Sequence, residues 1–105
     1  MKVVAPVEIR IPADHPVFAG HFPARPIVPG AMLIDRVAAA ATAATGCNVT
    51  GVAAAKFLQP VGPGEPLCVR FDQEAGDRLR FEVRGAAAVV AKGALWIAAV
   101  TPSTA

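Results

Sequence analysis

The spacing of hydrophobic and polar residues changes twice along the chain and predicts one helix between strands. Residues 2–10 alternate loosely and are rich in valine and isoleucine, which indicates a strand with Pro6 at an edge or a bulge. The residues from 30 or 31 to about 45 are apolar almost all round and rich in the strong helix formers Ala, Met and Leu, which predicts a buried helix. Gly46 then supplies a C-terminal cap.

Beyond this helix the pattern has the two-residue period of strands, most clearly in residues 67–72 and 79–84. Residues 11–20 contain several turn formers and predict a loop with room for one helical turn, whose Phe18 we expect to enter the core. One strand, one buried helix and then four strands is an α+β pattern, with one curled antiparallel sheet wrapped around the helix. The four later strands are predicted at 48–58, 65–74, 78–90 and 94–101, with turns at 60–64, 75–77 and 91–93.

Composition and charge limit the classes of function. The chain has 105 residues, of which 54% are hydrophobic and 17% charged, and this predicts one folded domain over residues 1–105. The net charge is only +2 and no cluster of Lys or Arg is visible, so nucleic acid is not an expected partner. The dispersed basic residues suffice at most for a shallow patch that faces an acidic protein.

The cysteines and the apolar segments indicate a soluble protein in a reducing compartment. Cys47 and Cys68 fit no CxxC or zinc spacing, so we expect both to be small buried hydrophobic residues. Pro6 interrupts the N-terminal apolar segment before a signal peptide can form, and residues 37–44 are too short to span a bilayer. We therefore expect a cytoplasmic location and no membrane contact.

The candidate chemistry lies between His21 and Asp35. Three prolines and one glycine stand in the first ten residues of this segment, so that part is neither a helix nor a central strand. Pro29 suits a helix start, and Gly30 lets a backbone or a ligand approach closely. The first N–H groups of the helix would point outward with a partial positive charge. An imidazole, a carboxylate and a helix N-terminus are the parts of an acid/base site with an oxyanion hole.

Each of these residues also has a plainer interpretation. His21 could be a loop histidine that bonds only to the backbone, and Asp35 could be a polar residue at a bend of the helix beside an arginine. Arg36 is a poor partner for that carboxylate, because adjacent residues on a helix do not face each other. Two histidines without further ligands do not make a metal site.

The string GHFPARPIVPGAMLID at residues 20–35 resembles the signature of the 3-hydroxyacyl-(acyl carrier protein) dehydratases, which have the hot-dog fold. In that family a Gly-His-Phe-Pro run leads through a Pro-Gly pair to a Glu or Asp on the central helix, and the spacing from His21 to Asp35 matches. Residues 56–65 are similar to the family's phenylalanine, Pro-Val and Pro-Gly-acidic run. The resemblance covers most of the chain, from about residue 13 to residue 100.

This resemblance implies a hydro-lyase that converts 3-hydroxyacyl thioesters to trans-2-enoyl thioesters in fatty acid or specialised acyl and polyene biosynthesis. His21 would remove the C2 proton, and Asp35, kept protonated in an apolar pocket, would donate to the departing 3-hydroxyl. The Gly30 N–H would stabilise negative charge on the thioester oxygen. No cofactor is implied, because the phosphopantetheine of acyl carrier protein carries the substrate. The resemblance also implies a homodimer, or a higher oligomer of dimers, in which the histidine of one chain faces the carboxylate of the other.

We expect an apolar acyl-binding surface beside these groups. Ala39 stands where many members of the family have a glutamine, and aspartate replaces the glutamate of the main chain-elongating enzymes. Two other interpretations stay open. One is a hot-dog acyl thioesterase. The other is a non-catalytic acyl-binding subunit of a dehydratase complex, which the alanine at position 39 in place of glutamine leaves possible. The candidate acyl-binding residues are Phe22, Pro29, Ala31, Met32, Leu33, Phe57 and Leu58.

Overall fold

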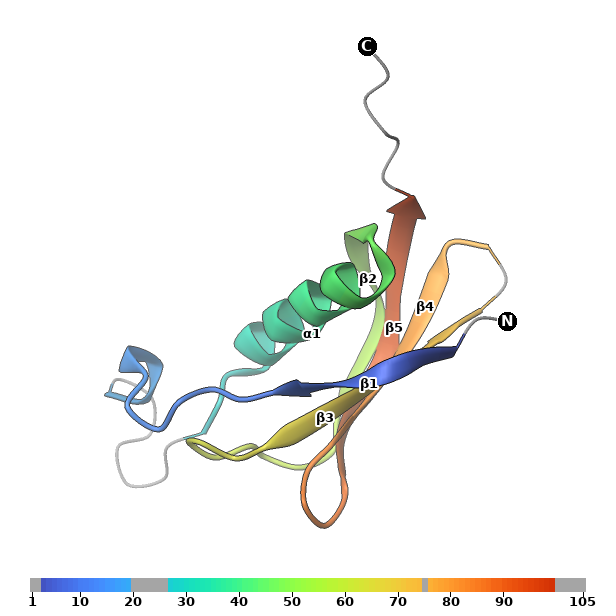
Figure 1. Ribbon diagram of the computed structural model, residues 1–105. Coiled ribbons are helices and arrows are strands. Elements are labelled where there is room, and N and C mark those ends of the chain that lie inside the picture. The colour runs from blue at the N-terminus through green and yellow to red at the C-terminus, as the bar shows by residue number, and fades with distance from the viewer. Residues whose placement is uncertain (1–2, 20–26, 75, 100–105) are drawn as a thin grey trace.

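A computed structural model describes residues 3–19, 27–74 and 76–99, and these form one antiparallel sheet with a helix on one face (Figure 1). The strand order across the sheet is β1-β3-β4-β5-β2, and every neighbouring pair is antiparallel. The predicted α+β architecture is therefore confirmed. The elements in chain order are β1 (Val3–Ile9), the short 3-10 helix η1 (Pro16–Ala19), α1 (Gly30–Thr45), β2 (Cys47–Phe57), β3 (Leu67–Gln73), β4 (Arg78–Arg84) and β5 (Val89–Ala99).

The core lies between the sheet and α1, and strict alternation along β3 and β4 contributes six of its residues. Every second residue of each strand is buried, while the residues between them are exposed or half-buried. Successive side chains of a strand point to opposite faces, so one face of this sheet is apolar and the other polar. Each fully buried Phe, Leu or Val side chain contributes about 1.5–3 kcal/mol to folding. The inward residues are Leu67, Val69 and Phe71 on β3 and Leu79, Phe81 and Val83 on β4.

The helix α1 begins and ends where the sequence predicts. Pro29 is its N-cap residue, and Gly46 ends it in the left-handed conformation with φ 74°, donating its N–H to the Thr42 carbonyl at 2.9 Å. The buried residues Leu33, Val37, Ala40 and Ala41 follow helical spacing and form one stripe toward the sheet.

The expectation of a helix buried all round was wrong for this single chain. The side of α1 away from the sheet is exposed and consists mainly of alanine and short polar side chains. One five-stranded sheet covers only one side of a helix, and alanine is neutral enough to lie on either side, so the sequence could not distinguish them. The exposed helix residues are Ala31, Asp35, Arg36, Ala39, Thr42 and Ala43.

The segment before α1 is fixed to the loop between β2 and β3. The Val28 N–H donates to the Val61 carbonyl, and the Gly64 N–H donates to the Ile11 carbonyl, both at 2.8 Å. Phe18 on η1 is 8% exposed and belongs to the core, as predicted. These contacts hold the N-terminus of α1 beside the end of β2.

The boundary between the last two strands differs from the prediction. The turn lies at residues 85–88, closed by a 2.9 Å bond from the Gly85 N–H to the Ala88 carbonyl, and β5 runs through the predicted turn at 91–93. Gly93 belongs to a strand because two strands come close there: a Cβ would collide with the Ala54 backbone carbonyl. A glycine that permits close approach was therefore misread as a glycine that makes a turn.

The edge strand β1 has the predicted irregularity at its proline. Its register with β3 shifts between Val4 and Val7, a bulge that includes Pro6. The predicted burial of both cysteines was wrong, since Cys68 is exposed and Cys47 is only half-buried. Cys68 stands between the inward-facing residues of β3, so the alternation of the strand turns its side chain outward.

Candidate active site

The predicted site residues divide into three groups. His21 and Phe22 lie outside the described residues. Pro29, Gly30, Ala31, Met32 and Asp35 lie at the N-cap and in the first turns of α1. Phe57 ends β2, and Leu58 follows it. The fold brings Gly30 of the second group against Phe57 of the third, although 27 positions separate the two in the sequence.

The closest of these contacts joins Gly30 to Phe57. A Cβ built on Gly30 would lie 2.9 Å from one atom of the Phe57 ring and 3.1 and 3.3 Å from two others. Such distances are shorter than van der Waals contact, so a side chain at this position would displace the ring. Phe57 is 50% exposed, so its ring covers the glycine while its other side remains open to solvent. The glycine is thus required for close approach, as the sequence predicts.

A hollow of about 310 Å³ opens beside this contact, between the start of α1, the end of β2 and the loop that follows. Its lining is mostly apolar, and the Leu58 N–H fixes one wall by donating to the Val90 carbonyl at 2.8 Å. Such a volume and lining suit a short acyl chain or the reacting end of a longer one. The lining residues are Ile27, Val28, Gly30, Leu33, Phe57, Leu58, Gln59, Pro60 and Val61.

The hollow contains some of the predicted acyl-binding residues and not others. Of the described ones, Leu33, Phe57 and Leu58 line it, whereas Pro29, Ala31 and Met32 do not. Gly30, which was predicted to stabilise the thioester oxygen, also lines it. The apolar residues of the two proline-containing loops, of which Val28 and Val61 are buried, were not predicted. No periodic pattern marks them, and loop segments usually lie on the surface.

Asp35 lies on a different side of α1 from the hollow. Five residues of an α-helix advance about 7.5 Å along the axis and turn by about 140°, so Gly30 and Asp35 cannot face the same point. The Asp35 side chain is exposed and makes no ion pair or hydrogen bond with the described residues. The expected apolar pocket around this carboxylate is therefore not formed by the described part of the chain.

The helix N-terminus supplies the polar element of the hollow. The first helical hydrogen bond of α1 runs from the Leu33 N–H to the Pro29 carbonyl, at 3.1 Å. The N–H groups of the first three helical residues have no intrahelical acceptor, and they carry the positive end of the helix dipole. Because Gly30 itself lines the hollow, this end of the helix offers donors to a carbonyl oxygen bound there.

The described ranges contain neither a cluster of metal-binding side chains nor a helix that could cross a membrane. Among residues 3–19, 27–74 and 76–99, no group of three or more His, Cys, Asp or Glu side chains is placed to bind a metal ion. The helices described by the structure include none that is both long enough and apolar enough to cross a membrane.

Comparison with known proteins identifies the family. The model of the ApeI-like family, described as ApeI dehydratase, matches residues 2–94. The chain belongs to the ApeI-like dehydratase family. Curated relatives of this ApeI-like chain include the 3-hydroxyacyl-[acyl-carrier-protein] dehydratases FabZ of Gluconacetobacter diazotrophicus, 36% identical over 93 residues, and of Gluconobacter oxydans, 33% identical over 93 residues. Each alignment covers 76% of this chain, and 56% and 54% of the respective relative. The chain thus spans about half the length of the curated relatives it matches.

Solved structures confirm the hot-dog fold of this ApeI-like protein. The dehydratase heterocomplex ApeI:P from Xenorhabdus doucetiae contains a chain that is similar with a TM-score of 0.77 and 24% identity, over 92% of this chain and 88% of that one. A fluoroacetyl-CoA-specific thioesterase, FlK, is similar with a TM-score of 0.56 and 16% identity, over 93% of this chain and 94% of that one. At these identities the likeness shows the fold alone, and the fold is shared by a dehydratase and a thioesterase.

Proposed function

We propose that this protein removes water from 3-hydroxyacyl thioesters carried on acyl carrier protein and yields trans-2-enoyl thioesters. The observation that carries the proposal is the position of Gly30, at the open N-terminus of α1 and in the wall of an apolar hollow. A thioester whose acyl chain enters this hollow brings its carbonyl oxygen within reach of the helix N–H groups. Membership of a dehydratase family supports the same reaction.

In the proposed reaction His21, as the neutral imidazole, takes the proton from C2 of the substrate. Negative charge then develops on the thioester oxygen, where the Gly30 N–H and the helix dipole stabilise it. The electron pair forms the C2=C3 double bond as the C3–O bond breaks. Asp35, in its protonated form, gives a proton to the departing hydroxyl, which leaves as water. Two proton transfers then return the imidazole and the carboxyl group to their starting states.

The exposed position of Asp35 leads us to propose that a second copy of the chain completes the site. Burial in an apolar environment favours the protonated carboxyl group, and in one chain Asp35 is exposed. The outer edge of β2 supports pairing with another copy: β2 has eleven residues, pairs only with β5 among the described strands and has no proline. An unpaired edge of this length needs a cover, whereas the other edge strand, β1, is interrupted by Pro6 and a bulge.

A dimer built across the β2 edges would place the exposed sides of the two α1 helices near each other. Val52, which is 48% exposed on β2, and the alanine-rich side of α1 would then be covered. In this arrangement Asp35 of one chain meets His21 of its partner, and each dimer contains two sites. The proposal accounts for an acidic side chain on an otherwise nearly apolar helix.

The reaction is tested with 3-hydroxyacyl and trans-2-enoyl thioesters, because the conjugated enoyl group absorbs in the ultraviolet and its formation or hydration can be followed directly. We expect interconversion of the two thioesters, and loss of it in His21→Ala and Asp35→Asn. Arg36→Gln is the matched control, since Arg36 is equally exposed on the neighbouring position of α1 and has no proposed role. Release of free thiol without an enoyl product would identify a thioesterase instead. Absence of both reactions from a folded, dimeric protein would support the non-catalytic interpretation.

A further inference from the structure

A second hollow, of about 320 Å³, lies on the face of the sheet opposite α1. Its floor consists of small residues, since Ala54 pairs with Ala94 and Gly93 lies beside them. Ala94 lies on the same face of β5 as the exposed residues Lys92 and Trp96, yet it is only 1% exposed. Longer side chains around it cover it. The charged residues of the lining are Lys56, Arg78, Arg80 and Lys92 together with Asp72 and Glu82. We call this hollow the outer-face groove.

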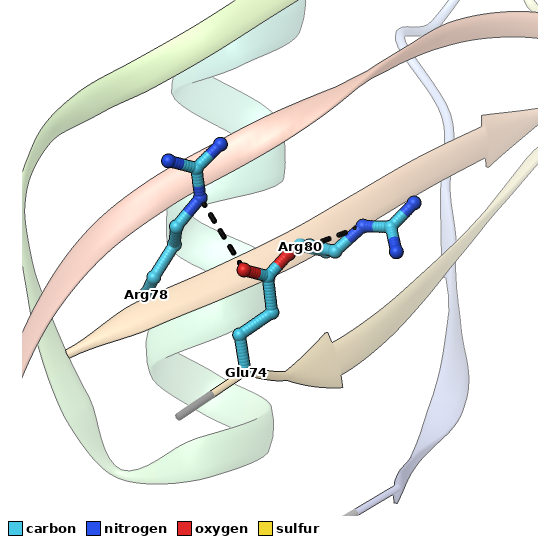
Figure 2. Close-up of polar contacts among 3 residues, drawn as sticks. All are labelled: Glu74, Arg78 and Arg80. Carbon is cyan, nitrogen blue, oxygen red and sulfur yellow. Dashed lines mark ion pairs between the residues drawn. The ribbon is translucent and has the colours of Figure 1, made fainter. Parts of the chain in front are cut away.

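Two carboxylates at the outer-face groove, those of Glu74 and Glu82, have arginine partners. The Glu74 carboxylate forms ion pairs with Arg78 and Arg80, at Nε-to-carboxylate distances of 3.6 and 3.4 Å (Figure 2). Glu82 accepts a 2.8 Å hydrogen bond from the Arg84 Nε, which lies outside the groove. Asp72 forms no ion pair within 4.0 Å among the described residues, and Glu82 is the cross-strand neighbour of Lys92 on β4.

The two lysines of the groove stand directly opposite each other. Lys56 on β2 is the cross-strand partner of Lys92 on β5, and both side chains are exposed. Like charges in such positions repel each other, which is unfavourable for the sheet unless a negative group lies between them. Neither lysine forms an ion pair within 4.0 Å in the described part of the chain. Although Glu82 lies beside Lys92 on β4, the lining of the groove has four basic and two acidic side chains and is therefore net positive.

The groove lies close to the proposed active site along one strand. Lys56 immediately precedes Phe57, whose ring covers Gly30. Adjacent residues of a strand are about 3.3 Å apart along its axis and point to opposite faces. A partner protein held by Lys56 on the outer face therefore lies at the end of β2 where the apolar hollow opens.

We propose that the outer-face groove binds the acidic surface of the carrier protein that delivers the thioester, with Lys56 and Lys92 receiving its carboxylates. This inference rests on the proposed function. Charge complementarity favours an acidic protein over a nucleic acid, because Asp72, Glu74 and Glu82 interrupt the positive surface and would repel a continuous phosphate backbone. Carboxylates spaced along a protein helix can meet the lysines and avoid the three acidic groups.

Steady-state kinetics with two forms of one substrate test this proposal. One form is the 3-hydroxyacyl group on acyl carrier protein, and the other is the same acyl group on N-acetylcysteamine, which lacks the protein. We expect Lys56→Glu/Lys92→Glu to raise KM for the carrier-bound form roughly tenfold while kcat/KM for the small thioester stays unchanged. Added salt should raise the wild-type KM for the carrier-bound form only, since screening weakens exposed charge pairs. The matched control is Arg10→Glu, an exposed basic residue outside the groove that undergoes the same charge reversal.

Equal KM values for wild type and the double variant on the carrier-bound form would overturn the proposal, as would an equal rise in the Arg10→Glu protein. A loss of activity on both substrate forms would also count against it, because it would assign the lysines to the fold or the active site.

The fluorescence of Trp96, the single tryptophan of the chain, reports binding without turnover. Trp96 is 39% exposed and lies 5.6 Å from the Arg78 guanidinium at the edge of the groove.

Binding of acyl carrier protein should therefore change the Trp96 fluorescence of wild type but not of the lysine variant. This measurement separates the two proposals: binding without turnover would contradict the dehydratase function and leave the docking surface standing. Turnover of the small thioester without any binding of the carrier would support the dehydratase function and contradict the docking surface. A fluorescence change on adding duplex DNA that matches or exceeds the change with carrier would show a nucleic-acid surface and overturn the inference.

Discussion

At the scale of single residues, the contact between Gly30 and Phe57 determines the shape of the proposed site. The first helical residue has no side chain, and an aromatic ring takes the space that a Cβ would need. This leaves the helix N–H groups open toward the apolar hollow and sets its width. The motif in residues 20–35 identified Gly30 from the sequence, and the separate motif in residues 56–65 identified Phe57. That the two residues touch could not be read from either motif, because their contact depends on the curvature of the sheet.

We expect Gly30→Ala to displace the Phe57 ring and to lower kcat/KM at least tenfold. The stability of the protein should change by less than about 1 kcal/mol, because alanine favours a helix over glycine and the half-exposed ring is free to move. Thermal unfolding and kinetics measure the two effects. Gly46→Ala is the control: its φ of 74° disfavours alanine, so it should lose about 1 kcal/mol of stability and keep its activity. Full activity in Gly30→Ala would refute the role of this contact.

The proposed acid role of Asp35 belongs to the same scale. A reaction that needs an unprotonated base and a protonated acid has a bell-shaped profile of rate against pH. Asp35→Asn should lower the rate strongly and abolish the fall on the alkaline side, since asparagine does not titrate. Initial rates from acid to alkaline pH measure this. A variant that retains both limbs of the profile would show that another group is the acid.

At the scale of elements, β2 and α1 build the site while β3 and β4 support it. The alternation in β3 and β4 predicted their faces correctly, because every second residue is large and apolar. The end of β4 was misplaced, since its one turn former, Gly85, stands among small or apolar residues that also suit a strand. The exposed side of α1 could not be predicted either, because alanine accepts burial and exposure alike. Sequence reasoning thus failed where side chains are too small to indicate a face.

The apolar hollow between these elements should control the length of the acyl chain. Phe57 and Leu58 line the hollow and are 50% and 38% exposed. Phe57→Ala and Leu58→Ala should therefore widen the hollow without leaving a cavity in the core. We expect both variants to shift the profile of kcat/KM toward longer acyl chains, by roughly tenfold for a substrate two carbons longer. Met32→Ala is the control, since Met32 does not line the hollow and should leave the profile as it is. Identical profiles for all three variants would place the acyl chain elsewhere.

At the scale of the whole molecule, the proposed site is incomplete in a single chain. Asp35 is exposed on α1, and within residues 3–19, 27–74 and 76–99 the outer edge of β2 is unpaired and the alanine-rich side of the helix is exposed. One interface with a two-fold partner would cover all three surfaces, because a self-complementary contact brings the same elements of both chains together.

Mixing two inactive variants tests most directly whether His21 and Asp35 of different chains form the site. His21→Ala and Asp35→Ala proteins are each expected to be inactive, and they are unfolded and refolded together in equal amounts. Random pairing makes about half of the dimers mixed, and each mixed dimer has one intact site out of two, so about a quarter of the wild-type activity should return. Each variant refolded alone is the control and should remain inactive. If mass spectrometry confirms mixed dimers and no activity returns, the shared site is contradicted.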